Sequence, residues 1–377
     1  MTYPDATPRH DVHAPADLRS LTALRFVAAM WVAVYALWDN LAISFRPDLV
    51  AKGYLGVELF FVLSGFILCH VYLEAHGNRR FSYRDFLWAR VARVYPLHIA
   101  TLLGVMALGF VALAAGMAID ANVMSWAALP ANIAMVHAWG LSPEAGWNHR
   151  SWSISAEWFA YLLFPVFAVV AWRLRSVPGL AIAGALALLA ALYVGFAAVA
   201  GFPLTEATFQ WGALRIVPCF AYGCALYLAY RRAPLKAPGL LALAATVGLI
   251  GAASLNLWDG IIVALAGLLI LALASLPNAR AGWLASKPAV YLGEISYAVY
   301  MVLVPWQLLA VNLAAKVTGA PDKHLQLFVW LPILVALPVV AAIAYHLVEF
   351  PARRAIRTWA ARRPEAIKRN QAARQIA

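Results

Sequence analysis

Ten apolar stretches, each about as long as a membrane-crossing helix, follow one another along this 377-residue chain. They are residues 20–42, 54–74, 97–118, 151–172, 178–200, 211–230, 238–256, 259–276, 289–313 and 326–348. About 20 helical residues are needed to cross the hydrocarbon of a bilayer, and open sheet edges are not tolerated there. The pattern therefore predicts an all-α integral membrane protein with about ten transmembrane helices.

The basic residues are unevenly distributed over the two sides of such a bundle. Ten spans place both termini on one side, and most of the 29 lysine and arginine residues fall there. The opposite side holds Arg46, Lys52, Arg150, Lys316 and Lys323. By the positive-inside rule we predict that both termini are cytoplasmic. The net charge of +12 is then explained by topology and contact with anionic membrane lipids, which argues against a nucleic-acid partner.

Little of the chain is left to form a soluble domain. We expect a cytoplasmic leader over residues 1–19, a transmembrane domain over 20–350 and a basic cytoplasmic tail over 351–377. Residues 75–96 mix five arginines with aromatic residues, which predicts an amphipathic helix at the membrane interface, with Pro96 beginning the next span. The three cysteines all lie inside apolar stretches and are expected to be buried packing residues, so no metal site is predicted.

Charged residues inside the apolar stretches are the first candidates for a functional site. A guanidinium such as that of Arg25 costs at least ~2.5–3.5 kcal/mol at the centre of a membrane helix, so a partner or ligand is expected. The alternative is an arginine that reaches the lipid headgroups. The predicted topology puts one group toward the cytoplasmic face, namely Arg25, His70, Glu294 and Glu349. It puts another toward the outer face, namely Asp39, Glu58, Glu157 and Arg215. This division predicts two polar chambers, each taking one substrate.

Helical geometry connects Arg25 with the outer half of the first span. Ala29, Val32, Ala36 and Asp39 lie within about 40° of the Arg25 direction at 100° per residue. This face of mostly small side chains either lines a channel or packs tightly against a neighbouring helix. For the buried carboxylates three roles are open: an ion pair, for instance with Arg215, acceptor binding or proton transfer.

Seven segments, in order, resemble the membrane-bound acyltransferase family 3, which transfers acyl groups, commonly acetyl, onto bacterial surface carbohydrates. They are residues 18–32, 53–68, 84–98, 151–165, 214–223, 292–305 and 348–351. The resemblance covers nearly all of residues 18–355 and implies a multi-pass protein of the bacterial inner membrane. It implies transfer from cytoplasmic acetyl-CoA or another acyl-CoA to a hydroxyl of a carbohydrate or lipid-linked sugar, with no permanently bound cofactor.

Two positions depart from the pattern of that family. Arg25 matches the family's arginine, but the histidine that follows after ten intervening residues is replaced by Ala36. A second family histidine, in the ninth span, is replaced by Leu303. A sugar hydroxyl needs a base to accept its proton, and neither alanine nor leucine is one.

Three explanations for the missing histidine are open. The one we favour is an inactivated sequence in which alanine replaces a native histidine at position 36. The second is an enzyme that uses another base, namely Asp39, Glu58, Glu157 or His149. The third is a pseudoenzyme, or a membrane transporter, that binds lipid or acyl-CoA without catalysis. Transporters often contain inverted repeats, and no such repeat is evident in this sequence.

The resemblance and the residues together assign the site as follows. Position 36 is the place of the general base, and Arg25 belongs with it to the catalytic motif. Acyl-CoA is predicted to contact Arg25, Arg90, Arg93 and His70, where arginine suits phosphate recognition better than lysine. The acceptor is predicted to contact Asp39, Glu58, Glu157, Arg215 and His149. We accordingly expect an O-acyltransferase whose activity is impaired in this chain.

Overall fold

The computed structural model describes residues 17–116, 123–232 and 235–360. Most of the expected leader (residues 1–16) and of the expected tail (361–377) lies outside the described residues. The helices are α1 (Arg19–Leu37), α2 (Asp48–Ala51), α3 (Gly56–Gly77), α4 (Tyr83–Ala114), α5 (Leu129–Ile133), α6 (Trp152–Leu162), α7 (Phe164–Leu174), α8 (Pro178–Ala200), α9 (Gly212–Arg232), α10 (Pro238–Ser254), α11 (Asp259–Ser275), α12 (Lys287–Thr318) and α13 (Leu327–Ala344). Short 3₁₀ turns cover Trp38–Asn40, Lys52–Leu55, His149–Ser151, Leu204–Glu206, Asn278–Arg280 and Gly282–Ala285. A π-helical turn, Tyr345–Glu349, follows α13, and the helix then continues to Ala360.

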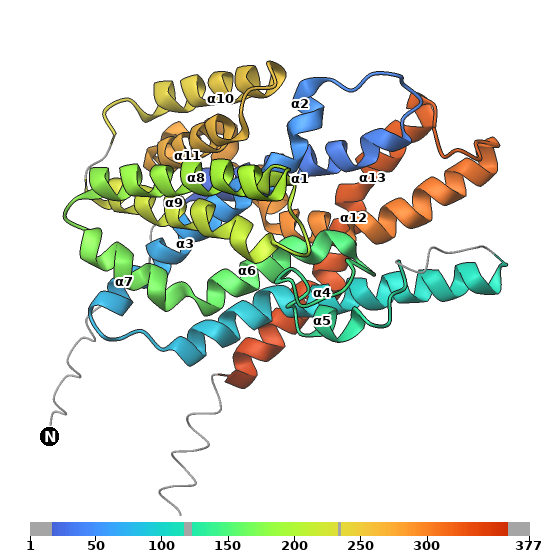
Figure 1. The fold of residues 1–377 in the computed structure, drawn as a ribbon, viewed down its shortest axis with the longest axis horizontal. Coiled ribbons are helices and arrows are strands. Elements are labelled where there is room, and N and C mark those ends of the chain that lie inside the picture. Colours follow the sequence, from blue (N-terminus) through green and yellow to red (C-terminus); the bar gives the residue numbers. More distant parts are fainter. Residues whose placement is uncertain (1–16, 117–122, 233–234, 361–377) are drawn as a thin grey trace, which may run out of the picture.

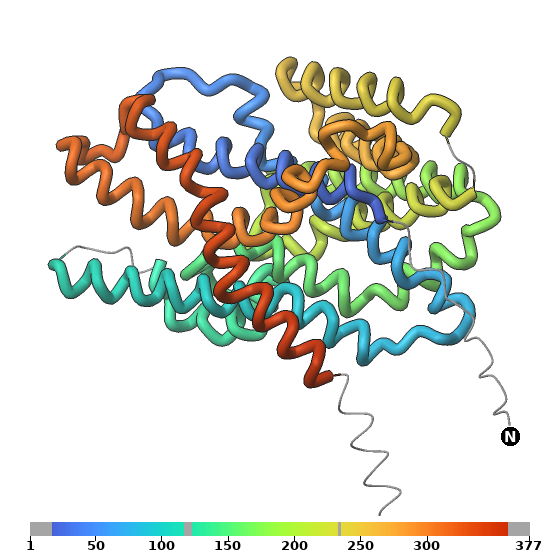
Figure 2. Tube along the Cα trace, turned by 180° about the vertical axis from the view of Figure 1, so that it is seen from behind, coloured from blue at the N-terminus to red at the C-terminus, as the bar shows by residue number. Residues whose placement is uncertain are grey.

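The architecture is an all-helical bundle of a membrane protein. Seven helical segments in the described ranges are long and apolar enough to cross a membrane, and the bent pair α6–α7 makes an eighth if it is one span. The shorter helices α10 and α11 are also apolar. In Figure 1 α10 lies at one edge of the bundle and α4 at the opposite edge, and Figure 2 shows α13 crossing the bundle diagonally. The predicted fold class is confirmed, whereas the number of ten spans and the cytoplasmic termini stay predictions.

Two segments that contain a proline differ from the expected elements. Pro96, expected at the start of a span, lies inside the continuous 32-residue helix α4, which joins the expected interfacial helix to the span that follows. The expected span 151–172 is instead two helices that meet at Leu163 with a bend of 59°. Pro165 lies in the first turn of α7 and has no N–H to continue the hydrogen bonding of α6, which accounts for the break.

Glycines allow two helix pairs to approach closely. A Cβ atom added at Gly223 of α9 would collide with the carbonyl oxygen of Val62 of α3. At Gly293 of α12 an added Cβ would collide with the carbonyl oxygen of Thr22 of α1. Small residues at such positions let backbones pack directly against each other in membrane bundles. The α1–α12 contact lies one helical turn from Arg25 and therefore helps to fix its position.

Changing Gly293 to alanine is expected to destabilise the protein by about 1–3 kcal/mol, because the backbone at Thr22 must move. Changing Gly184 of α8 to alanine is the matched control, since nothing lies within 4 Å of the added Cβ there. Thermal unfolding in detergent should show a lower midpoint for Gly293→Ala alone. Equal midpoints for the two variants would show that α1 and α12 are not in close contact.

Candidate active site

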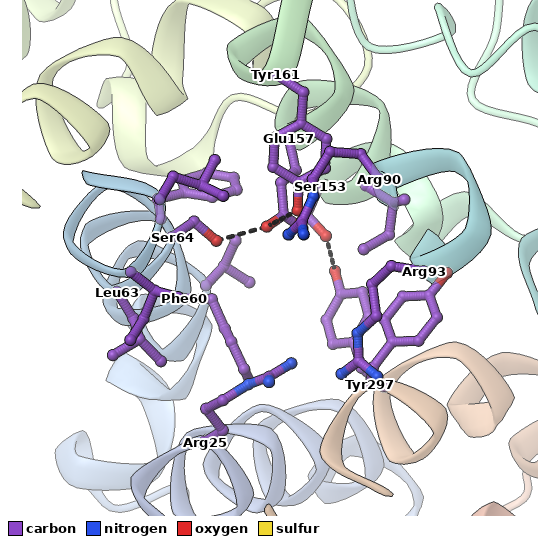
Figure 3. A pocket seen from close by; sticks show the side chains of 16 residues that line it. Arg25, Phe60, Leu63, Ser64, Arg90, Arg93, Ser153, Glu157, Tyr161 and Tyr297 are labelled. Carbon is purple, nitrogen blue, oxygen red and sulfur yellow. Dashed lines mark hydrogen bonds between the residues drawn. The ribbon is translucent and has the colours of Figure 1, made fainter. Parts of the chain in front are cut away.

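A cavity lies within the bundle where five helices meet. Its polar lining comes from Arg25 of α1, Ser64 of α3, Arg90 and Arg93 of α4, Ser153, Glu157 and Tyr161 of α6, and Tyr297 and Tyr300 of α12. Apolar side chains, among them Phe60, Leu63 and Ile67 of α3, complete it. The cavity has a volume of about 130 Å³. Figure 3 shows side chains from separate helices converging on one space. The three arginines predicted to contact acyl-CoA therefore share a site with Glu157, which was predicted to contact the acyl acceptor.

Arg25 points into this cavity (Figure 3). Among the described residues it forms no hydrogen bond or ion pair, although its charge interacts with those of Arg93, Glu157 and Glu349. A guanidinium within a membrane helix normally has a partner, because its desolvation is costly. The expectation that Arg25 faces the interior rather than the headgroups is met by this geometry, and its donors are available to a ligand.

Arg90 and Arg93 are held in different ways. The Arg90 guanidinium lies 5.7–5.8 Å from the ring centroids of Tyr72, Phe86 and Tyr161, within the range of cation–π attraction. Its Nη2 donates to the Tyr72 hydroxyl at 3.3 Å, and its buried Nε has no partner in the described chain. Arg93 instead forms an ion pair with the buried Glu349. Arg90 therefore has more free hydrogen-bonding capacity than Arg93.

Glu349 owes its position to the π-helical turn that follows α13. Its side chain is fully buried, and Oε1 accepts from Arg93 of α4 and lies 3.8 Å from Arg353. Its other oxygen, Oε2, has no partner among the described residues. π-helical turns often occur at functional sites. The residue was recognised in the sequence as an intramembrane charge, but its pairing with Arg93 was not foreseen.

Glu157 is the carboxylate that lines the cavity. Its Oε1 accepts hydrogen bonds from Ser64 Oγ at 2.5 Å and from the Tyr161 hydroxyl at 2.6 Å. Next to it, Ser153 Oγ donates to the Tyr300 hydroxyl at 2.8 Å, and that hydroxyl donates to the carbonyl oxygen of Arg150 at 2.7 Å. The tyrosines and Ser64 were not predicted as site residues. Tyr161 had a signal in the sequence, since it follows Glu157 by four residues and so lies on the same helix face.

The predicted pairing of Arg215 with a carboxylate is confirmed, and Glu58 is its partner. Arg215 Nε donates to Glu58 Oε1, Nη1 donates to the carbonyl of Ala207 at 2.7 Å, and the guanidinium lies 4.5 Å from the Trp152 ring centroid. Glu58 and Arg215 are 0% and 2% exposed, and neither lines the cavity. Their geometry is that of a structural ion pair between α3 and α9.

Glu58→Gln is expected to destabilise the protein by about 3–5 kcal/mol, because the Arg215 charge would be left buried without its counter-ion. The exposed pair of Asp39 and Arg46 supplies the control, and Asp39→Asn should change stability little. Chemical or thermal unfolding of both variants in detergent tests this expectation. A Glu58→Gln protein as stable as the unchanged chain would contradict the structural role of the pair.

The remaining predicted residues lie outside the cavity. Asp39 is exposed and paired with Arg46, and His149 is exposed in the turn before α6. The His70 ring packs against the rings of Tyr227 and Tyr230. Ala36 is 4% exposed, and its carbonyl oxygen accepts from Gln307 Nε2 at 3.3 Å.

The face of α1 that leads from Arg25 to Ala36 is closely packed. Ala29 and Val32 are 1% and 2% exposed, and neither lines the cavity. Of the two interpretations of this face, tight helix packing agrees with the structure. Leu303, at the place of the family's second histidine, is fully buried in α12.

A second buried polar cluster was missed in the sequence because its members come from separate segments. The rings of His98 and His137 are stacked with their centroids 5.9 Å apart. His137 Nε2 lies 3.1 Å from Ser151 Oγ, and His98 Nε2 lies 2.8 Å from the carbonyl oxygen of Asn132. The cluster connects the α5 region to α4 and to the turn before α6.

Burial, and then repulsion from the nearby His98, lowers the pKa of the His137 imidazole from 6.5 to about 3. In the unfolded chain the ring takes up a proton near pH 6.5, so stability is expected to fall as the pH drops from about 6.5 toward 3. The slope from this group is at most about 1.4 kcal/mol per pH unit. Unfolding midpoints should depend less on pH in His137→Gln than in the control His324→Gln, which changes an exposed histidine. Identical pH profiles would refute this role.

Comparisons with known proteins find a matching family model and several relatives. The model of the acyltransferase domain family matches residues 18–347. The acyltransferase MdmB of Streptomyces mycarofaciens is 31% identical over 326 residues, which cover 76% of this chain and 78% of that protein. A peptidoglycan O-acetyltransferase by name, YrhL of Bacillus subtilis (strain 168), is 36% identical over 77 residues, 20% of this chain and 11% of its own length. Protein 2 in the picA locus of Rhizobium radiobacter is 38% identical over 93 residues, 25% of this chain and 46% of its own length. No solved structure matches the chain.

Proposed function

Because this chain belongs to the acyltransferase domain family, we propose that it transfers an acyl group, acetyl in the first instance, from acyl-CoA to a sugar hydroxyl. The observation that carries the proposal is Arg25, a guanidinium that faces the cavity without a partner among the described residues. The name of the Bacillus subtilis relative supports an O-acetyl product on a carbohydrate. The acceptor is then a surface carbohydrate or a lipid-linked sugar.

In this proposal, acyl-CoA is bound by the arginines of the cavity. Arg25 and the free donors of Arg90 are suited to hydrogen-bond anionic oxygens of acyl-CoA and the thioester carbonyl. Arg93 lines the cavity but is engaged by Glu349, which holds its side chain in place. His70, which packs on Tyr227 and Tyr230, is no longer favoured as a donor contact.

In this proposal the acyl group crosses the bilayer through the helical bundle. Acyl-CoA enters from the cytoplasm, and the acceptor is on the outer side of a bacterial inner membrane. The asymmetric distribution of basic residues supports this orientation. Glu58 and Arg215 then contribute to the acceptor side by holding α3 against α9, and not by contacting the sugar.

The chain as it stands is proposed to have impaired activity, because position 36 carries no base. Two of the alternative bases are already engaged, since Glu58 is paired with Arg215 and Asp39 with Arg46. His149 is exposed in a short turn away from the cavity lining. These contacts argue against a substituted base at these three sites, and they leave Glu157, which lines the cavity, as the alternative base.

Binding of acetyl-CoA to the unchanged chain tests the donor assignment. A ligand present at about 100 times its Kd stabilises the folded state by about 2.7 kcal/mol, so acetyl-CoA should raise the unfolding midpoint in detergent. Free acetate at the same concentration is the control and should have no effect. If acetyl-CoA fails to bind, both the enzyme and the acyl-CoA-binding pseudoenzyme are excluded for this chain. The pseudoenzyme is favoured only if binding occurs and Ala36→His brings no transfer.

A further inference from the structure

The cavity contains a hydroxyl and a carboxylate arranged as a nucleophile and its base. Ser64 Oγ donates to Glu157 Oε1 at 2.5 Å, and both side chains line the cavity that Arg25 enters (Figure 3). A serine becomes a nucleophile when an adjacent base accepts its proton, and the base is usually oriented by a third group. Here the Tyr161 hydroxyl donates to the same carboxylate oxygen at 2.6 Å and fixes its orientation.

We propose that Ser64 accepts the acyl group from acyl-CoA and carries it as an ester before it passes to the acceptor. The inference rests on the proposed function, since it takes acyl-CoA as the donor. It adds a covalent acyl-serine, formed within the membrane on α3.

The first half-reaction balances as follows. Ser64 Oγ attacks the thioester carbonyl carbon, a C–O bond forms, and the serine proton moves to Glu157. The tetrahedral intermediate collapses with cleavage of the C–S bond, and the CoA thiolate leaves. The proton held by Glu157 then passes to the thiolate, which regenerates the carboxylate. In the second half-reaction an acceptor hydroxyl attacks the ester, and Ser64 recovers its proton as the sugar ester forms.

The surroundings of Ser64 suit this chemistry. The Arg25 guanidinium, which has no partner among the described residues, lies in the same cavity and supplies hydrogen-bond donors for the oxyanion of the tetrahedral intermediate. The apolar side chains of Phe60, Leu63 and Ile67 line the same space. Such a lining limits access of water, which protects an ester from hydrolysis.

Ser153 shows what distinguishes Ser64. It lines the same cavity, but its hydroxyl donates to the Tyr300 hydroxyl and not to a carboxylate. Ser153 therefore lacks a base.

The two half-reactions have different requirements in this scheme. Acylation of Ser64 needs Glu157, which is beside it, whereas the second half-reaction also needs an acceptor hydroxyl in the cavity. The chain supplied with acetyl-CoA alone should therefore release one equivalent of CoA and stop as the acyl-enzyme.

The experiment uses the full chain in detergent with radiolabelled acetyl-CoA, followed by intact mass spectrometry and peptide mapping. We expect one acetyl group on Ser64 in the unchanged chain and in Ser275→Ala, which changes a serine of α11 outside the cavity lining, and none in Ser64→Ala. Ser64→Cys should form a thioester that neutral hydroxylamine cleaves, which keeps the test valid if Ser64→Ala does not fold. Glu157→Gln should slow labelling by about 10²–10⁴-fold.

Two failures can be told apart. If Ala36→His transfers acetyl to a sugar while no variant carries an acetyl-serine at position 64, the covalent step is wrong and the proposed function stands. If acetyl-CoA neither binds nor reacts with any variant, the proposed function fails and the inference with it. Labelling of Ser64→Ala to the level of the unchanged chain would also overturn the inference.

Discussion

Replacing Ala36 with histidine is expected to raise acyl transfer by about 10²–10⁴-fold, the usual contribution of a positioned general base. The imidazole would stand eleven residues after Arg25, a rise of ~16 Å along α1, in the half of the helix predicted to face outward. Detergent-purified protein supplied with acetyl-CoA and sugar acceptors provides the measurement. CoA release and acetylated sugar should be quantified together, because only the sugar product reports the complete reaction.

The control for this variant is Val27→His, which places an imidazole on the same helix at a side chain that is 54% exposed. It should leave transfer at the level of the unchanged chain. Ala36 itself is 4% exposed, so folding of Ala36→His must be verified from its unfolding midpoint. A folded Ala36→His protein without any gain, set beside an unchanged chain that is already active, would show that position 36 is not the place of the base.

Arg25→Ala is expected to lower the rate of acyl-CoA consumption by about 10²–10³-fold in the Ala36→His background, as removal of one oxyanion donor does. Binding of acetyl-CoA should weaken as well, since charge-assisted hydrogen bonds are lost. Arg25 has no ion-pair partner among the described residues, so the substitution leaves no buried carboxylate unpaired. The unfolding midpoint should therefore change little.

The effects of Arg25→Ala on stability and on acetyl-CoA binding should be compared with those of Arg93→Ala. Arg93 is paired with the buried Glu349, and its loss should destabilise the fold as well as the site. Parallel measurements of unfolding midpoint and acetyl-CoA binding separate the two roles. Full binding and full activity in Arg25→Ala would show that the cavity arginine serves packing alone.

Some of the site was predictable because membrane burial makes charge expensive. Arg25 and Arg215 stood out in apolar stretches, and the depth of Arg215 correctly predicted a carboxylate partner at the same level. The length and number of the apolar stretches predicted the all-α bundle, because a bilayer does not tolerate open sheet edges. Asp39 was weighted in the same way, but it lies at the end of α1 where solvent is accessible, and its depth alone overstated its burial.

Other features depend on the direction in which a side chain points and on which helices pack together, and a sequence pattern specifies neither. Depth placed Glu157 with the acceptor residues, yet its side chain contacts Ser64 of α3 and lines the cavity of the arginines. The pair of Arg93 and Glu349 joins residues 256 positions apart, and nothing local in either segment indicates the contact. The Ala29–Ala36 face was ambiguous because small residues serve close packing and open channels equally well.

The π-helical turn at Tyr345–Glu349 makes the length of this segment as important as its side chains. A π turn accommodates an additional residue relative to an α turn. Deleting one residue within it should convert the turn to regular helix and rotate Phe350–Ala360 by about 100° relative to α13. Glu349 would then leave Arg93, and Arg353 would turn away with it because the two residues are four apart on the same helix. An insertion or deletion here, unlike one in an exposed loop, should therefore separate the C-terminal segment from Arg93 of α4 without altering any of its residues.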